Sequence, residues 1–174
     1  MNNKYTTDKV SSDMITMMVK QMGAKEVKSD PAHINIYHFE LVEGVELIYK
    51  IDIRSGKGMY LHRITPYPIL LGKFYGETDI IEYIKRDLAK FSKACNSKNF
   101  DRFIETTDKL SEFNRQIEQL FLNRNVPYEL MDKFLEDLDR VHETIEEIAA
   151  KSPMLYEDER PVGLSKEDRD MEEL

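Results

Sequence analysis

The sequence predicts an α+β fold in the order α-β-β-β-α-α-α: an N-terminal helix, a three-stranded antiparallel sheet, a helix and a long antiparallel helical hairpin. The first observation is that apolar residues change from a spacing of three and four to a spacing of two, and later change back. The second is a pair of long heptad repeats separated by a short break. The chain has 174 residues, 41% of them apolar, which suffices for one ordinary core. We therefore expect a single domain over residues 1–153, with an α-β-β-β-α part at 1–98 and a hairpin at 99–153.

The first helix is predicted from an amphipathic pattern that ends at a glycine. Thr6, Thr7 and Asp8 supply side-chain oxygens that can cap its start. Apolar residues then recur every four positions, and Gly23 stands where a helix would stop. The stripe is formed by Val10, Met14, Met18 and Met22. Such a stripe usually belongs to a core, and the alternative is an adaptable methionine-rich binding face.

Three antiparallel strands are predicted between residues 36 and 64, where apolar residues alternate. Gly44 and the sequence Ser55-Gly56-Lys57-Gly58 provide the two turns. Pairing Phe39 with Tyr49, Leu41 with Leu47 and Ile51 with Leu61 places these apolar residues together on one face. The opposite face is half apolar and is expected either to be covered by the chain's own helices or to bind a partner. Its apolar members are Ile36, Ile48, Tyr60 and Ile64, which lie among His38, Lys50, Asp52 and His62.

The C-terminal half of the chain is predicted to be helical. After an irregular connection at 69–76, Thr78 and Asp79 precede an amphipathic helix that ends near Asn96. Residues 100–122 and 127–151 then carry the two heptad repeats. The break between them is short and places Pro127 at a helix start, so the two helices should run antiparallel. Residues 154–174 are acidic and poor in apolar side chains, which is typical of a disordered tail.

The cellular setting is predicted from what the sequence lacks. It has neither a run of about 20 apolar residues for a membrane helix nor the apolar centre of a signal peptide. The single cysteine, Cys95, lies in a helical apolar pattern and cannot form an internal disulfide. We therefore expect a cytoplasmic protein without membrane contact, in which Cys95 is a packing residue.

No catalytic or metal-binding signature is present, so we expect neither an enzyme nor a bound metal or cofactor. Phosphate-binding glycine loops, the GxSxG, HExxH and paired CxxC patterns are all missing. His38 and His62 would share a cross-strand row, but Lys50 between them opposes a cation. His142 flanks the last heptad repeat and is expected to be partly buried. The many carboxylates of the last helix lie mostly outside its apolar seam, which favours a solvated face.

The charge distribution raises nucleic-acid binding as the alternative function. Residues 45–98 carry a net charge of +4 and residues 99–174 a net charge of −11. The α-β-β-β-α order resembles that of double-stranded RNA-binding domains, yet Glu77 and Asp79 stand where that family has lysines at the start of its last helix. The residues that would contact phosphate are Arg54, Lys57, Arg63, Lys85 and Arg86.

The leading hypothesis is a protein-interaction module, such as an adaptor, a chaperone-like factor or an inhibitor. Besides the sheet face, its candidate partner-binding residues are Phe113 and Leu120, which flank the first heptad seam. Each hairpin helix should be on the order of 35 Å long, whereas strands of ordinary length span near 20 Å. The seam is also wider than two helices need, because Leu135, His142 and Ala149 flank the second helix. The sequence therefore predicts a homodimer that pairs two hairpins.

Overall fold

The computed structural model describes residues 3–29 and 31–155. The chain divides into two compact units, one up to His33 and the other from Ile34 onward. The single domain expected over residues 1–153 stays a prediction. The acidic tail predicted at 154–174 falls almost entirely outside the described residues.

The N-terminal unit consists mainly of helix α1, Asn3–Gln21. The helix begins earlier than expected, so that Thr6, Thr7 and Asp8 lie within it. It ends as the glycine predicts: the Ala24 N–H donates to the Val19 carbonyl at 3.1 Å and the Gly23 N–H to that of Lys20 at 3.0 Å. Gly23 has a φ of +108°, which makes this end a Schellman motif. None of the side chains of residues 9–29 is buried, so this stretch contributes no core residue.

The second unit is built on a four-stranded sheet in the order β1-β2-β3-β4, where β1 is Ala32–Val42, β2 Val45–Arg54, β3 Gly58–Thr65 and β4 Ile69–Phe74. The predicted pairing of Ile51 with Leu61 is confirmed. The rings of Phe39 and Tyr49 lie 5.8 Å apart, as expected for neighbours on one face. These contacts place the predicted apolar face in the core.

Strand β4 is a correction to the expected fold, since its residues formed the predicted irregular connection. Apolar residues in β4 do not alternate regularly, and a register shift between Leu61 and His62 explains why. The shift lets Leu71 join the core although its neighbour Leu70 pairs with His62. The fourth strand also removes the α-β-β-β-α order on which the resemblance to RNA-binding domains rested.

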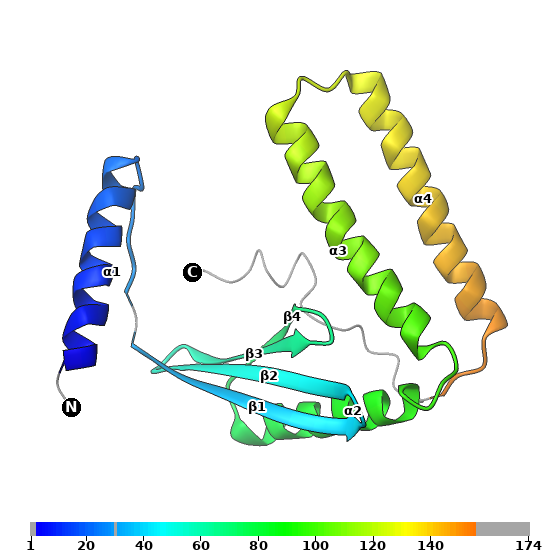
Figure 1. The fold of residues 1–174 in the computed structure, drawn as a ribbon, viewed down its shortest axis with the longest axis horizontal. Helices are drawn as coiled ribbons and strands as arrows, with labels where there is room; N and C mark the ends of the chain where they lie inside the picture. Colours follow the sequence, from blue (N-terminus) through cyan, green and yellow to red (C-terminus); the bar gives the residue numbers. More distant parts are fainter. Residues whose placement is uncertain (1–2, 30, 156–174) are drawn as a thin grey trace. The chain divides into compact units, whose positions relative to one another are not determined.

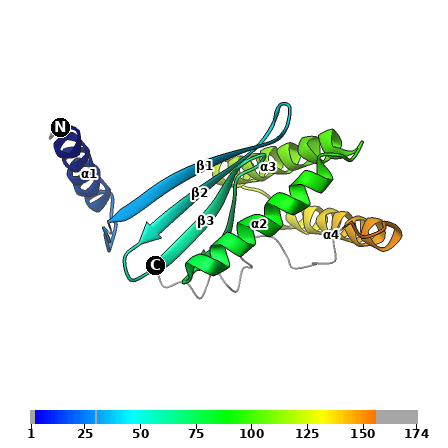
Figure 2. The same cartoon turned by 90° about the horizontal axis from the view of Figure 1, so that it is seen from below.

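The core lies between the sheet and helix α2, Glu77–Ala94, which runs along one face of the sheet (Figures 1 and 2). Thr78 and Asp79, expected to cap this helix, lie in its first turn because the helix begins at Glu77. Cys95 packs against the core as predicted, and burial raises the pKa of its thiol. The buried apolar cluster consists of Leu47, Tyr49, Ile51, Leu61, Leu71, Ile80, Phe91 and Phe100.

The helical hairpin is observed where the heptad repeats predict it. Helix α3 is Phe100–Asn123 and helix α4 is Tyr128–Lys151, and the two run antiparallel (Figure 1). Phe100 belongs to the core cluster and Ile104 packs against it, so the start of α3 is anchored on the sheet domain. Within residues 3–29 and 31–155, no helix combines the length and the apolar composition that a bilayer crossing requires.

Candidate functional site: the exposed face of the helical hairpin

Helix α4 has an apolar stripe that no other described element of residues 34–155 covers completely. It is 24 residues long and none of its residues is buried. In α3 the only buried residue is Phe100, at the end that joins the core. A helix with one apolar stripe normally gains its stability by burying that stripe against another element. Within residues 34–155, the hairpin thus presents an apolar surface that the sheet and α2 do not bury.

We define the hairpin face as the large apolar side chains at the seam and flanking positions of both helices. Its α3 residues are Phe103, Leu110, Phe113, Ile117, Leu120 and Phe121. Its α4 residues are Met131, Phe134, Leu135, Leu138, Val141, Ile145 and Ile148.

Only the part of this face near the turn is closed within the chain. Phe113 and Phe134 stack with their ring centroids 5.4 Å apart and their planes at 29°. Ile117 and Met131 are half-buried. Further along α4, Val141, Ile145 and Ile148 remain exposed. The expected seam therefore exists as a pattern on both helices, but the single chain closes only one end of it.

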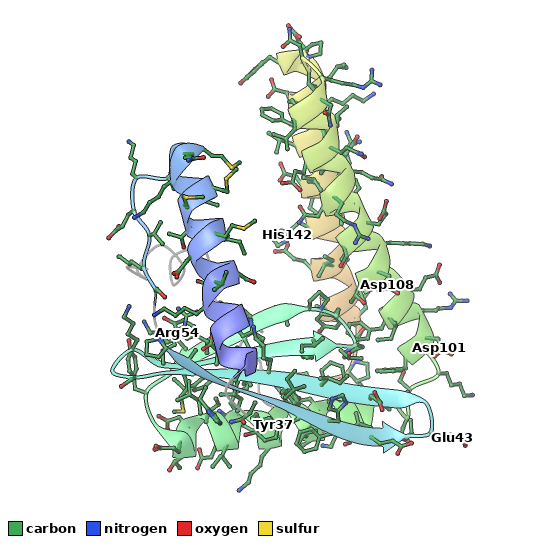
Figure 3. All side chains as sticks on the ribbon, turned by 60° about the vertical axis from the view of Figure 1, so that its left-hand side comes forward. Tyr37, Glu43, Arg54, Asp101, Asp108 and His142 are labelled. Atoms are coloured by element: carbon green, nitrogen blue, oxygen red, sulfur yellow. The ribbon has the colours of Figure 1, made fainter. Side chains whose placement is uncertain are left out.

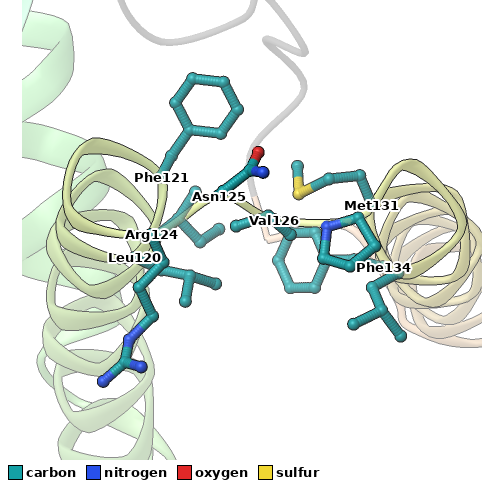
Figure 4. Close-up of a pocket in the computed structure, with 10 residues that line it drawn as sticks. Leu120, Phe121, Arg124, Asn125, Val126, Met131 and Phe134 are labelled. Carbon is teal, nitrogen blue, oxygen red and sulfur yellow. The ribbon is translucent and has the colours of Figure 1, made fainter.

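A pocket of about 280 Å³ lies at this closed end, between the two helices and the turn that joins them (Figure 4). Its lining is almost wholly apolar, and Leu120, Phe121, Met131 and Phe134 contribute to it. Arg124 and Asn125 are its polar members. Such a lining suits an apolar group and offers few polar atoms to orient a small substrate.

The charged groups of the hairpin lie outside the hairpin face and pair with one another. Glu112 binds Arg115 at 2.8 Å, and the hydrogen bonds from Arg115 and Gln116 lower the pKa of its carboxyl. Asp137 pairs with Arg140 at 2.8 Å. These contacts link residues three or four positions apart on exposed helix surface, which is the expected arrangement for a solvated face.

His142 is more exposed than the sequence predicts. We expected a partly buried imidazole beside the seam, whereas 74% of its side chain is accessible, and Nε2 lies 3.3 Å from Glu146 Oε1 (Figure 3). The difference has the same cause as the exposure of Ile145, since no other helix of residues 34–155 covers either residue.

The predicted partner-binding residues fall on two surfaces. Phe113 and Leu120 lie on the hairpin face, Phe113 in the ring stack and Leu120 at the pocket. Ile36 and Ile64 are exposed on the sheet, whereas Ile48 is half-buried.

Tyr60 does not belong to an open surface. It is buried, with the Arg54 guanidinium 4.6 Å and the Lys73 ammonium 5.4 Å from its ring centroid. The apolar part of the second sheet face is therefore smaller than the sequence suggests.

The predicted phosphate-binding residues do not form one basic surface. Arg63 is 1% exposed and lies in the core, so it cannot reach a phosphate. Arg54 pairs with Asp52 at 3.1 Å besides covering Tyr60. Lys57 and Lys85 are exposed, and Arg86 is half-buried.

A buried polar cluster on the core side of the sheet escaped the sequence-based predictions. Arg63 lies over the rings of both Tyr67 and Phe91, with its guanidinium carbon 4.7 and 4.6 Å from their centroids. Its Nε is 3.5 Å from Asp87 Oδ2. The Tyr49 hydroxyl donates a hydrogen bond to the same oxygen at 2.7 Å, and burial together with that bond raises the pKa of Tyr49. Arg63 follows Met59 and Leu61 at a spacing of two, and this parity was the available signal.

The remaining titratable groups do not assemble into a metal centre in the described part of the chain. Residues 3–29 and 31–155 contain no group of three or more His, Cys, Asp or Glu side chains that could hold a metal ion. Burial, and secondly the nearby Lys50, lower the pKa of His62. Comparison with protein-family models, with curated proteins and with solved structures found no match for this chain.

Proposed function

We propose that this chain is a non-enzymatic protein-interaction module, an adaptor, chaperone-like factor or inhibitor, whose hairpin face binds protein. The observation that carries the proposal is that α4, with a full apolar stripe, has no buried residue. Contiguous exposed apolar surface beyond a few hundred Å² marks an interaction site in a stable protein. The proposal also places the protein in the cytoplasm as a homodimer, in keeping with its single free thiol.

The chemistry of the hairpin face favours a macromolecular partner over a substrate. The face is long and apolar, and the pocket between its two helices offers only Arg124 and Asn125 as polar lining residues. Catalysis needs groups that take up or stabilise charge at the reacting atoms. The sequence contains none of the common signatures that arrange such groups. A helical face that docks another helix requires only apolar side chains at the observed spacing.

The sheet supplies a second, smaller candidate surface. Ile36 and Ile64 are exposed there, and Ile48 is half-buried. Edge strand β1 also has only one neighbouring strand, β2, in the sheet. Strand addition at this edge is the means by which a partner would use it.

Quantitative affinity capture from the source cell tests the proposed function. The tagged full-length chain is compared with a Leu135→Glu variant, which places a carboxylate on the hairpin face, and with Leu122→Glu. Leu122 is the matched control, since it is an exposed leucine of α3 outside the hairpin face. We expect the unmodified chain and the control to retain a specific protein, either foreign or an untagged copy of this chain, that the Leu135→Glu variant loses. Identical captured sets for all three chains would contradict the proposal.

Binding to random duplex RNA and DNA separates the proposal from the nucleic-acid alternative. Phosphate contacts give affinities that fall steeply as salt rises. Because Arg63 is buried and Arg54 is paired, we expect no saturable binding at about 0.1 M salt, where the Debye length is about 10 Å. A binding constant whose logarithm falls linearly with the logarithm of the salt concentration would favour the alternative.

A further inference from the structure

We infer that the hairpin face is covered by the hairpin of a second copy of this chain, so that two hairpins form a four-helix bundle. The inference rests on the proposed function, because it names the protein that binds the face. It is supported by the width of the apolar stripe, by the area left exposed and by the charges that surround it.

The stripe on each helix is wider than a two-helix contact uses. Strict seams of a two-stranded coiled coil use two positions in seven, whereas core-facing helices of a bundle use three. In α4, Leu135 and Ala149 add a third position beside the seam, and His142 occupies the same row. In α3, Leu120 occupies the corresponding row, together with Phe113, which keeps part of its surface exposed beside its stack on Phe134. Each helix therefore has apolar surface for its hairpin partner and for a further helix.

The exposed area matches what a stable interface needs. Ten hairpin-face residues expose between 37% and 63% of their surface: Phe103, Leu110, Phe113, Leu120, Phe121, Leu135, Leu138, Val141, Ile145 and Ile148. With on the order of 170 Å² for each large apolar residue, this amounts to roughly 800 Å² per chain. A standard protein interface buries about 800 Å² on each partner. A single added peptide or a loop would cover only part of it.

The charges favour an identical partner over a foreign one. In a two-fold contact both partners bring the same groups, so acidic residues on the face would repel. The chain has a net charge of −8, yet no carboxylate, lysine or arginine occupies the seam rows or the flanking rows of the two helices, where the non-apolar residues are Thr106, Thr107, Asn114 and His142. The hairpin's ion pairs, such as Asp137 with Arg140, lie outside the face. A face without charge is self-complementary and offers a charged foreign partner nothing to pair with.

The two helices are also suited in length to pair with copies of themselves. Both have 24 residues, which corresponds to about 36 Å. Helix α1 has 19 residues, or about 28 Å, and provides only one helix. Coverage of the face by α1 of the same chain, or by a foreign protein, is the competing outcome.

Light scattering of the full-length chain at tens of micromolar measures its mass in solution, and thus whether a second copy is bound. One chain has a mass of 20.5 kDa, so two have about 41 kDa. We expect a dimer mass for the unmodified chain and for the Leu122→Glu control. Leu135→Glu and Ile145→Glu, two turns or more apart on the exposed part of α4, should each give the monomer mass with unchanged helical circular dichroism. Two variants are used so that loss of folding in one still leaves a test.

The other outcomes overturn the inference in distinguishable ways. A monomer mass for the unmodified chain removes the second copy. Slow amide exchange in α4 of that monomer would then show that the helix is stable without a second copy. A dimer mass that persists in both face variants would place the interface elsewhere. A monomeric chain removes the homodimer from the proposed function, but the protein-binding role of the hairpin face survives if Leu135→Glu still loses a captured foreign protein, and fails if it does not.

Discussion

The Arg63 guanidinium is held in the core by one carboxylate and two aromatic rings. A charge in a protein interior costs several kcal/mol unless it is paired. Asp87 supplies the opposite charge at 3.5 Å, and the rings of Tyr67 and Phe91 lie on the guanidinium. Arg63 Nη1 and Nη2 have no hydrogen-bond partner among the described residues, so the cation depends on Asp87 for its charge compensation.

Removing Asp87 should therefore destabilise the fold strongly. We expect Asp87→Ala to lower the free energy of unfolding by about 3–5 kcal/mol, because it leaves an uncompensated buried charge. Asp137→Ala breaks the exposed pair with Arg140 and should cost less than about 1 kcal/mol. Urea unfolding followed by circular dichroism measures both. The double variant Arg63→Met, Asp87→Leu should recover most of the loss, and equal effects of the two single aspartate variants would contradict this account.

His62 should make stability fall toward acid pH. Its pKa is lowered in the folded chain by burial and by Lys50, so the unfolded chain binds the proton more readily. The contribution of neutral His62 is present above the ordinary histidine pKa of about 6.5. It is lost as pH falls below that value and through the lower pKa of the folded state. Unfolding measured from pH 8 to pH 5 should show a smaller loss for His62→Gln, and the same slope in both chains would exclude His62 as the cause.

At the level of the elements, the turn between β2 and β3 depends on the absence of a side chain at Gly58. Its φ is +94°, and an added Cβ would lie 2.9 Å from the Phe74 carbonyl oxygen in β4. Gly56 in the same turn has a φ of +73° with open space around it. The two glycines thus share the positive φ and differ in the contact with β4.

Substitution at these two glycines should separate the two effects. We expect Gly56→Ala to cost about 1–2 kcal/mol, the usual penalty of a left-handed conformation for a residue with a Cβ. Gly58→Ala should cost at least about 2 kcal/mol, since it adds a backbone clash to the same penalty. Urea unfolding of both variants tests this. Equal costs would mean that β4 moves away from the turn without loss of stability.

The elements that the sequence predicts well are those with a regular period. The pairing of Ile51 with Leu61 and the bounds of α3 and α4 followed from spacings of two and of three and four. Strand β4 was missed because Pro66 and Pro68 precede it and a register shift breaks its alternation. Arg63 was assigned to the surface from its charge, although its parity with Leu61 places it in the core.

For the whole molecule, the periodic pattern identifies the hairpin but not what covers it. Leu138 illustrates the distinction: it occupies the middle of the predicted seam, yet it is exposed in the single chain. A heptad pattern predicts which side of a helix is apolar. Whether the side chains on that side are buried depends on which helices pack against it. The part of the candidate site closed within the chain, the stack of Phe113 on Phe134, needs no second protein.

The stability of the whole molecule should therefore depend on its concentration. If a second hairpin covers Leu138, dimer formation stabilises the folded state by mass action, and the melting temperature rises with protein concentration. Leu138→Asp would put a carboxylate into that contact, so its melting temperature should be lower and independent of concentration. Leu122→Asp should follow the unmodified chain, because Leu122 lies outside the hairpin face. Scanning calorimetry over about a hundredfold range of protein concentration measures the melting temperatures of all three chains. A melting temperature of the unmodified chain that does not change with concentration would show that dimer formation does not stabilise its hairpin.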